Sequence, residues 1–216
     1  FTRAELGLIA GLCREHDVVC ITDEVYEHLI YEPSLPHISV ASLPGMWDRT
    51  ITLSSMGKTF SLTGWKVGWA IAPEHLSAGV RACHQFMTFS TATPLQYGAA
   101  AAIRAVGTYS ADLRALLAGN RDLLSAALTR AGLTVYPSHS TYFLMADHTP
   151  LGLGDDRAFV THLIEKIGVA AIPPSGFYHH RELGKSLVRF AFCKKRETIE
   201  EAIRRLGSLR PVRRTI

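Results

Sequence analysis

The stretch ITLSSMGKTFSLTGWKVGWAIAP, residues 51–73, decides how the first half of the chain is interpreted. Its apolar run ends in Gly57-Lys58-Thr59, the triplet that also closes a nucleotide-binding P-loop. A P-loop needs a glycine at position 52, where this chain has Thr52, and a phosphate-binding helix directly after the lysine. Here the residues after Lys58 include two glycines and lead into another strand-like run. The sequence therefore argues against an ATPase.

Continuous apolar and β-branched runs predict three strands, each buried on both faces as in a parallel sheet, at residues 18–22, 49–56 and 66–73. A helix precedes the first run, with Thr2 as its N-cap and Glu5 as the capping-box partner. Helix and strands together indicate an α/β fold. Because ligands of open α/β sheets bind beyond the carboxyl ends of the strands, Asp23 and the turn at residues 54–58 are site candidates.

Two helical patterns follow the strands: a small-residue pattern at residues 94–106 and a long pattern from Ser110 to Gly132. After Gly132 the pattern changes, and two amphipathic helices ending at Gly168 and Gly207 alternate with short strand patterns. These strand patterns are at residues 133–138, 141–147, 168–174 and 186–193. We place a domain boundary inside the long helix, near residue 110. We therefore predict two domains, residues 1–109 and 110–216.

Composition and charge exclude several classes of protein. The hydrophobic share of 47% supports a packed core, and the net charge of +4 is modest. Basic residues gather at residues 204–216, which we interpret as a solvated helix end and a frayed terminus. No basic face with interleaved aromatics is visible, so no nucleic-acid partner is expected. No run approaches the roughly 18 apolar residues of a membrane span, so no membrane partner is expected either.

The cysteines and histidines predict no metal site. The cysteines lie in apolar runs without a Cys-x-x-Cys pair, which favours buried free thiols in a reducing compartment, the cytoplasm. They are Cys13, Cys20, Cys83 and Cys193. The pair His179-His180 is interpreted as part of a polar loop, because the histidines have no ligand spacing.

The strand ends carry the groups that pyridoxal phosphate chemistry needs. That cofactor requires a lysine for a Schiff base, a carboxylate on the pyridine nitrogen, and cationic or hydroxyl groups on the phosphate. Asp23 ends one strand, and Ser55 and Lys58 share the turn after the next. Lys66 follows Lys58 by eight positions, and Tyr26 lies three residues after Asp23, where its hydroxyl can reach the cofactor's phenolate oxygen.

The segments ITDEVYEHLIYE (21–32) and SSMGKTFSLTGWKVGWAIAP (54–73) resemble the fold-type-I, class I/II aminotransferases. They are most similar to the subgroup with the kynurenine aminotransferase/cysteine-conjugate β-lyases and the succinyldiaminopimelate aminotransferases. The resemblance extends over essentially the whole chain. Its other segments are HISVASLPGMWDRT, STYFLMAD, GVAAIPPSGFY and LVRFAFCKKRETIEEAIRRL.

The resemblance implies an enzyme that uses pyridoxal 5′-phosphate to move an amino group from an amino acid to a 2-oxo acid. It implies that Lys58 forms the Schiff base and moves a proton between the substrate Cα and the cofactor's C4′. It further implies that Asp23 pairs with the pyridinium nitrogen and that Tyr26 bonds the ring oxygen. Ser55 and Lys66 are then expected to bind the phosphate. Residues 1–109 correspond to the C-terminal part of the large domain, and residues 110–216 to the small domain.

Two further roles follow from the resemblance. Arg189 is expected to hold the substrate α-carboxylate, for which a bidentate guanidinium is better suited than a lysine. Phe89 matches a position that lines the pocket of the neighbouring subunit, so a homodimer with shared active sites is expected.

Several alternatives stay open. A C–S β-lyase shares every residue named above, and a non-catalytic segment kept for binding or dimerisation has the same fold. Taken singly, Arg189 would suit a structural ion pair, Asp23 a helix N-cap and Tyr26 core packing. The family's chains are nearly twice as long, so this chain looks like a C-terminal half. We expect the isolated chain to be weakly active or inactive.

Overall fold

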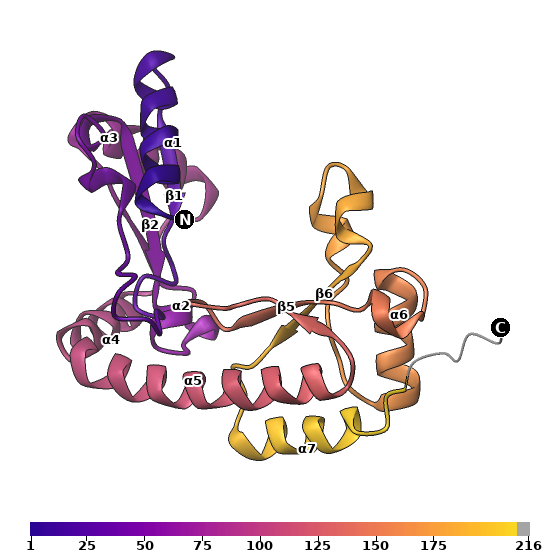
Figure 1. Ribbon diagram of the computed structural model, residues 1–216. Helices are drawn as coiled ribbons and strands as arrows, with labels where there is room; N and C mark the ends of the chain where they lie inside the picture. The colour runs from indigo at the N-terminus through magenta and orange to yellow at the C-terminus, as the bar shows by residue number, and fades with distance from the viewer. Residues whose placement is uncertain (211–216) are drawn as a thin grey trace. The chain divides into compact units, whose positions relative to one another are not determined.

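The computed structural model describes residues 1–210 and has a mixed α/β fold, as predicted (Figure 1). Contacts divide the chain into two compact units, Phe1–Asp112 and a second unit that begins at Leu113. Each unit contains one three-stranded sheet. The expected frayed terminus falls on residues 211–216, which lie outside the described residues.

The first unit contains the elements that carry most of the predicted site. Its helices and strands are α1 (Arg3–Glu15), β1 (Cys20–Asp23), β2 (Thr50–Ser55), α2 (Met56–Thr59), β3 (Gly68–Ile71), α3 (Glu74–Met87) and α4 (Thr93–Arg104). The long helix α5 (Val106–Arg130) begins in this unit and continues into the second.

Helix α1 begins as the sequence predicts. The Glu5 backbone N donates to Thr2 Oγ1 at 3.2 Å, and the Thr2 backbone N donates to the Glu5 carboxylate at 2.6 Å, which is a capping box. This backbone bond lowers the pKa of the Glu5 carboxyl. One face of α1 is buried against the segment before β2, through a cluster that includes Leu6 and Ala10 of the helix and Met46.

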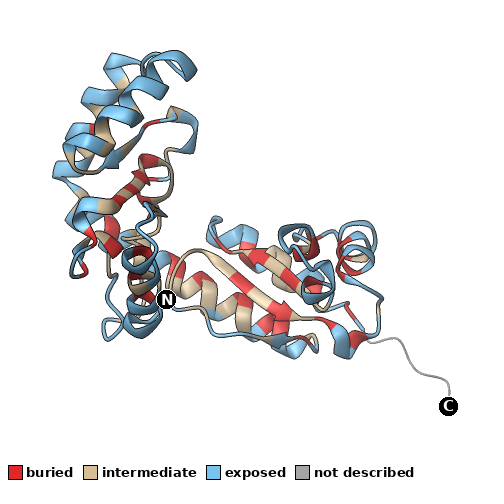
Figure 2. Ribbon diagram, turned by 90° about the horizontal axis from the view of Figure 1, so that it is seen from above, coloured by how far each residue is buried: buried red, intermediate tan, exposed pale blue. Residues whose placement is uncertain are grey.

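The sheet of the first unit mixes strand directions. Strand β1 is parallel to β2, with Asp23 opposite Leu53, whereas β3 is antiparallel to β2, with Gly68 opposite Ser55. The prediction of three strands buried on both faces is wrong. Only β2 alternates between buried and partly buried residues, while Ile21 in β1 is 65% exposed and Ile71 in β3 is 51% exposed. Burial on both faces needs a covering layer on each side, and the described residues do not provide one over β1 and β3 (Figure 2).

Helix α3 was not among the predicted elements. Its apolar side chains Leu76, Val80, Cys83 and Met87 recur every three or four residues, which is the spacing that identifies a helix. None of its residues is buried within the described chain. The helix therefore has the pattern of an amphipathic helix without a packed core beneath it.

The second unit is built on an antiparallel sheet. Its elements are β4 (Thr134–Val135), β5 (Phe143–Asp147), α6 (Asp156–His162), β6 (Leu187–Ala191) and α7 (Arg196–Leu206), with the strand order β4-β5-β6. The buried Asn120 of α5 donates to the main-chain oxygens of Phe192 at 3.2 Å and of Lys194 at 2.8 Å. These bonds fix the segment after β6 to α5.

One predicted strand of the second unit is absent. Residues 168–174 form no strand, and their one pairing is an isolated bridge between Ile172 and Arg189. Pro173 and Pro174 have no backbone N–H to donate, which prevents a continuous ladder. The preceding helical segment ends at Gly168, as predicted, with a left-handed φ of 74°.

The cysteines differ from the expectation. All four are free, but Cys83 and Cys193 are exposed, so the prediction of four buried thiols is wrong for these two. Cys20 is partly buried, and this burial raises the pKa of its thiol. His179 and His180 lie in an exposed loop, as predicted. Within residues 1–210, no helix is long and apolar enough to cross a membrane.

Candidate active site

The sheet of the first unit brings the predicted site residues to one edge. Because β1 and β2 are parallel, Asp23 and Ser55 end their strands at the same edge. Because β3 is antiparallel to β2, it starts at this edge, just after Lys66. The strand directions therefore place Asp23, Tyr26, Ser55, Lys58 and Lys66 at or directly beyond a single sheet edge.

The loop after β2 is held by its own hydrogen bonds. Ser55 Oγ accepts from the Gly57 backbone N at 3.3 Å and caps α2, while Thr63 Oγ1 donates to the Gly57 oxygen at 3.0 Å. The Met56 N donates to the Val67 oxygen at 3.0 Å, which closes the loop at its base. The structure adds the single turn of α2, whose four residues include Lys58, and no α-helix follows directly after the lysine, as the sequence indicated.

Lys58 lies beside Tyr26. Its Nζ is 5.9 Å from the centroid of the Tyr26 ring, within cation–π range. Both side chains are half-buried, whereas Asp23 and Lys66 are exposed. Asp23 Oδ1 accepts from the Val25 backbone N at 3.3 Å, so this carboxylate also stabilises the turn that leads to Tyr26.

Two carboxylates of this turn were not among the predicted site residues. Glu24 is 8% exposed, and Glu27 accepts a hydrogen bond from Ser54 Oγ at 2.6 Å. The signal in the sequence is the cluster of three acids within residues 23–27, directly after a strand-like run.

Arg189 belongs to the second unit, at the centre of β6. Its guanidinium carbon lies 4.5 Å from the centroid of the Phe143 ring and 4.8 Å from that of Phe177, so it is within cation–π range of two aromatic rings. Its Nε is buried and has no hydrogen-bond partner among the described residues. The structural ion pair that Arg189 alone would suggest is not found among the ion pairs of residues 1–210.

The sequence patterns did not predict that the rings of Phe143 and Phe177 contact Arg189. Phe143 is the first residue of β5, and Phe177 ends a 3-10 turn at Pro174–Phe177. Nothing in their spacing indicates that they meet the same arginine. The buried Nε has no hydrogen-bond partner among residues 1–210, so Arg189 is not bound to a structural acceptor through this atom.

Phe89 lies just after α3 with a strained backbone. Its φ is 68°, which is rare for a bulky residue, and its side chain is 81% exposed. Three more apolar side chains of this region, Phe86, Met87 and Tyr97, are exposed by 76% or more. An exposed aromatic ring on a constrained backbone is suited to contacts outside its own unit.

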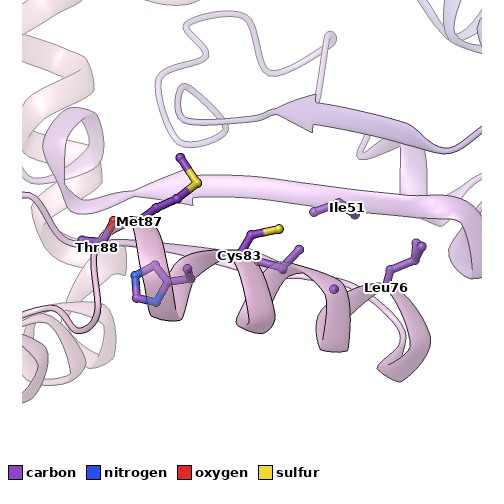
Figure 3. Close-up of a pocket in the computed structure, with 8 residues that line it drawn as sticks. Ile51, Leu76, Cys83, Met87 and Thr88 are labelled. Atoms are coloured by element: carbon purple, nitrogen blue, oxygen red, sulfur yellow. The ribbon is translucent and has the colours of Figure 1, made fainter.

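A groove lies between α3 and the sheet (Figure 3). Its volume is about 510 Å³, and Ile51, Leu76, Cys83, Met87 and Thr88 are among its lining residues. The lining is mostly apolar and includes none of the predicted site residues. The groove therefore does not suit a charged cofactor.

The groups at the sheet edge fit pyridoxal phosphate by their chemistry. A carboxylate, a phenol, a hydroxyl and two ammonium groups come together there, from Asp23, Tyr26, Ser55, Lys58 and Lys66. Within the described part of the chain, no cluster of His, Cys, Asp or Glu side chains is placed to hold a metal ion.

The chain is similar in sequence to known aminotransferases. The family model "Aminotransferase class I and II" matches residues 1–206. The chain is 45% identical to the probable N-succinyldiaminopimelate aminotransferase DapC of Mycobacterium tuberculosis, over 95% of this chain and 53% of the relative. It is 39% identical to the human kynurenine–oxoglutarate transaminase 1, over 93% of this chain and 52% of that protein.

Solved structures of the same fold are similar over nearly the whole chain. The N-succinyldiaminopimelate aminotransferase from Mycobacterium tuberculosis superposes with a TM-score of 0.92 at 46% identity, over 96% of this chain and 54% of that one. YbdL from Escherichia coli, described as having a methionine aminotransferase function, superposes with a TM-score of 0.90 at 36% identity, over 97% and 54% of the two chains. The chain thus spans about half the length of the relatives it matches.

Proposed function

Since this chain belongs to the class I and II aminotransferase family, we propose that the protein that carries it is a pyridoxal-phosphate-dependent aminotransferase. Its substrates are an amino acid and a 2-oxo acid, and the amino group passes between them in a ping-pong cycle. The observation that carries this proposal is the placement of Lys58 beside Tyr26, at the sheet edge where Asp23, Ser55 and Lys66 also lie.

Each side chain at the edge has a proposed task. When bound, pyridoxal phosphate supplies the aldehyde that captures the amino group and the ring that withdraws electrons from the substrate Cα. Lys58 would hold the cofactor through its Nζ and would carry a proton between the substrate Cα and the cofactor's C4′. Asp23 would keep a proton on the ring nitrogen, and Tyr26 would donate to the phenolate oxygen. Ser55 and Lys66 would bind the phosphate.

Arg189 is proposed to bind the α-carboxylate of the substrate. Support comes from its contacts with two aromatic rings and from its Nε, which has no hydrogen-bond partner among the described residues. A guanidinium is a planar fork that binds a carboxylate through two parallel hydrogen bonds.

Borohydride trapping tests the assignment of Lys58. We expect the purified protein with added pyridoxal phosphate to turn yellow, and borohydride reduction to fix one cofactor mass on the peptide that contains Lys58. The reason is that reduction makes the bond between Nζ and the cofactor permanent. Mass spectrometry of the digested protein gives the modified position. Modification spread over exposed lysines such as Lys166, with none at Lys58, would contradict the proposal.

A parallel assay tests the reaction type. Amino transfer is measured with a panel of amino acids and 2-oxo acids, and pyruvate release is measured with a cysteine conjugate. We expect amino transfer to be the faster reaction. Trapping on Lys58 together with faster pyruvate release would identify a β-lyase, and trapping without either reaction would identify a non-catalytic binding protein.

We further propose a homodimer, located in the cytoplasm. The exposed apolar side chains around Phe89 support an interface, and the four free cysteines suit a reducing compartment. Light scattering on the purified protein is expected to give twice the mass of one chain. Phe89→Ser is expected to weaken the dimer, whereas Leu35→Ser, at an exposed position outside this region, is the control. A monomeric mass at micromolar concentration would contradict the proposal.

A further inference from the structure

Two carboxylates flank Tyr26, and the proposed chemistry uses neither of them. Glu24 precedes Tyr26 by two residues and Glu27 follows it directly. Glu24 is 8% exposed, although a buried carboxylate is unfavourable unless hydrogen bonds replace the lost water. Their contacts therefore indicate what they hold in place.

Glu24 joins a distant loop to the end of β1. Its Oε1 accepts hydrogen bonds from Thr22 Oγ1 at 2.9 Å, Ser39 Oγ at 3.1 Å and the Val40 backbone N at 3.3 Å. Its Oε2 lies 2.7 Å from His37 Nε2, which donates because an ionised carboxylate can only accept. The four partners come from β1 and from residues 37–40, so this one carboxylate ties the two segments together.

Glu27 joins the same turn to β2. Its Oε1 accepts from Ser54 Oγ at 2.6 Å, and Ser54 is buried within β2. Ser54 comes directly before Ser55 and four residues before Lys58. A hydrogen bond at Ser54 therefore couples the turn that carries Tyr26 to the strand that carries Lys58.

Main-chain bonds complete the attachment of the turn. The Glu24 N donates to the Leu53 oxygen at 2.8 Å, the Glu27 N donates to the Glu24 oxygen at 2.9 Å, and the Leu29 N donates to the Tyr26 oxygen at 2.8 Å. Leu29 is fully buried. Tyr26 thus lies on a short segment that is bonded on both sides of its own position.

We propose that Glu24 and Glu27 are positioning residues. They hold the turn at residues 23–29 so that the Tyr26 hydroxyl keeps a fixed position relative to Lys58. This inference rests on the proposed function, because it gives Tyr26 a bond to the cofactor. The two glutamates do not touch the reacting atoms and act through Tyr26. Precise placement matters here, because a displacement of about 1 Å at a reacting centre can lower a rate about 100-fold.

A double-mutant cycle on the protein that carries this chain tests the coupling. The variants are Glu27→Ala, Tyr26→Phe and the double variant, and the measured quantity is the apparent dissociation constant for pyridoxal phosphate, from the cofactor's absorbance. We expect each single variant to weaken binding by about tenfold, the scale of one hydrogen bond. If Glu27 acts through Tyr26, the double variant binds about as weakly as Tyr26→Phe alone, about tenfold more weakly than the unaltered protein. Independent effects would instead make the double variant about 100-fold weaker than the unaltered protein.

Two further variants extend the cycle. Ser54→Ala removes the donor of the hydrogen bond between Ser54 and Glu27. It is expected to weaken cofactor binding as Glu27→Ala does, and only when Tyr26 is present. It replaces Glu27→Ala in the cycle if that variant does not fold. Glu24→Gln removes one acceptor oxygen from the bonds to residues 37–40 and is expected to shift the absorption maximum of the bound cofactor in the same direction as Tyr26→Phe. The matched control is Glu15→Ala, at an exposed glutamate at the end of α1.

The outcomes separate the inference from the proposed function. Two outcomes would overturn the inference alone. One is that the effects of Glu27→Ala and Tyr26→Phe are additive. The other is that Tyr26→Phe weakens cofactor binding while Glu27→Ala and Glu24→Gln have no effect. Loss of folding in both Glu27→Ala and Ser54→Ala would assign these residues a purely structural role and overturn it as well. Absence of cofactor binding by the unaltered protein would overturn both proposals.

Discussion

Replacing Lys58 by alanine is expected to lower the rate of amino transfer by at least about 10⁴-fold. The substitution removes both the amine that bonds to the cofactor and the base that moves the proton, and general acid–base catalysis alone contributes about 10²–10⁴-fold. Initial rates with saturating amino acid, 2-oxo acid and pyridoxal phosphate measure the effect. The variant is also expected to release its cofactor on gel filtration and to show no cofactor mass after borohydride reduction.

The control for Lys58 is another lysine of the same chain. Lys166 is exposed in the second unit and is not one of the proposed site residues, so Lys166→Ala is expected to keep the rate of the unaltered protein. Circular dichroism checks that both variants are folded. If Lys58→Ala retained more than about one hundredth of the rate, a different group would have to be the base, and the assignment of Lys58 would be wrong.

Replacing Arg189 by lysine is expected to lower kcat/KM for amino acids by about 100-fold. A lysine keeps the positive charge but cannot form two parallel hydrogen bonds to a carboxylate, and it has no planar guanidinium to contact Phe143 and Phe177. A hydrogen bond to a charged group is worth about 1.5–3 kcal/mol, and each 1.4 kcal/mol is a factor of ten. Steady-state kinetics with the best amino acid donor measure the loss.

A substrate without the carboxylate makes the test specific. For the decarboxylated amine of the same donor, the unaltered protein and Arg189→Lys are expected to have similar, low kcat/KM values, because there is no carboxylate to bind. The control is Arg157→Lys, at an exposed arginine of α6, which is expected to change neither value. Equal losses for the amino acid and for the amine would show that Arg189 stabilises the fold instead of binding the substrate.

Local patterns predicted most elements of the chain but not how they pair. The capping box at Thr2 and the helix end at Gly168 depend on residues that are close in sequence, and both predictions are confirmed. The strand predicted at residues 168–174 failed, because Pro173 and Pro174 interrupt the hydrogen bonds that a ladder needs. The direction of β3 and the exposure of Ile71 depend on pairing and covering layers, which no local pattern records.

The sequence by itself determined which chemical groups the site can offer: a lysine, a carboxylate, a phenol and phosphate-binding groups at strand ends, and an arginine in a later strand. Residue type and spacing are enough to predict these groups, because the residues directly after a strand lie at the end of the sheet, where ligands bind. Only the tertiary structure decided that the antiparallel β3 returns Lys66 to the edge where Asp23 ends, and that Phe143 and Phe177 contact Arg189. It also decided that Glu24 binds residues 37–40 and that Glu27 binds Ser54. These contacts join segments that are far apart in the chain, so their geometry arises only when the backbone hydrogen bonds of the folded sheet fix the segments side by side.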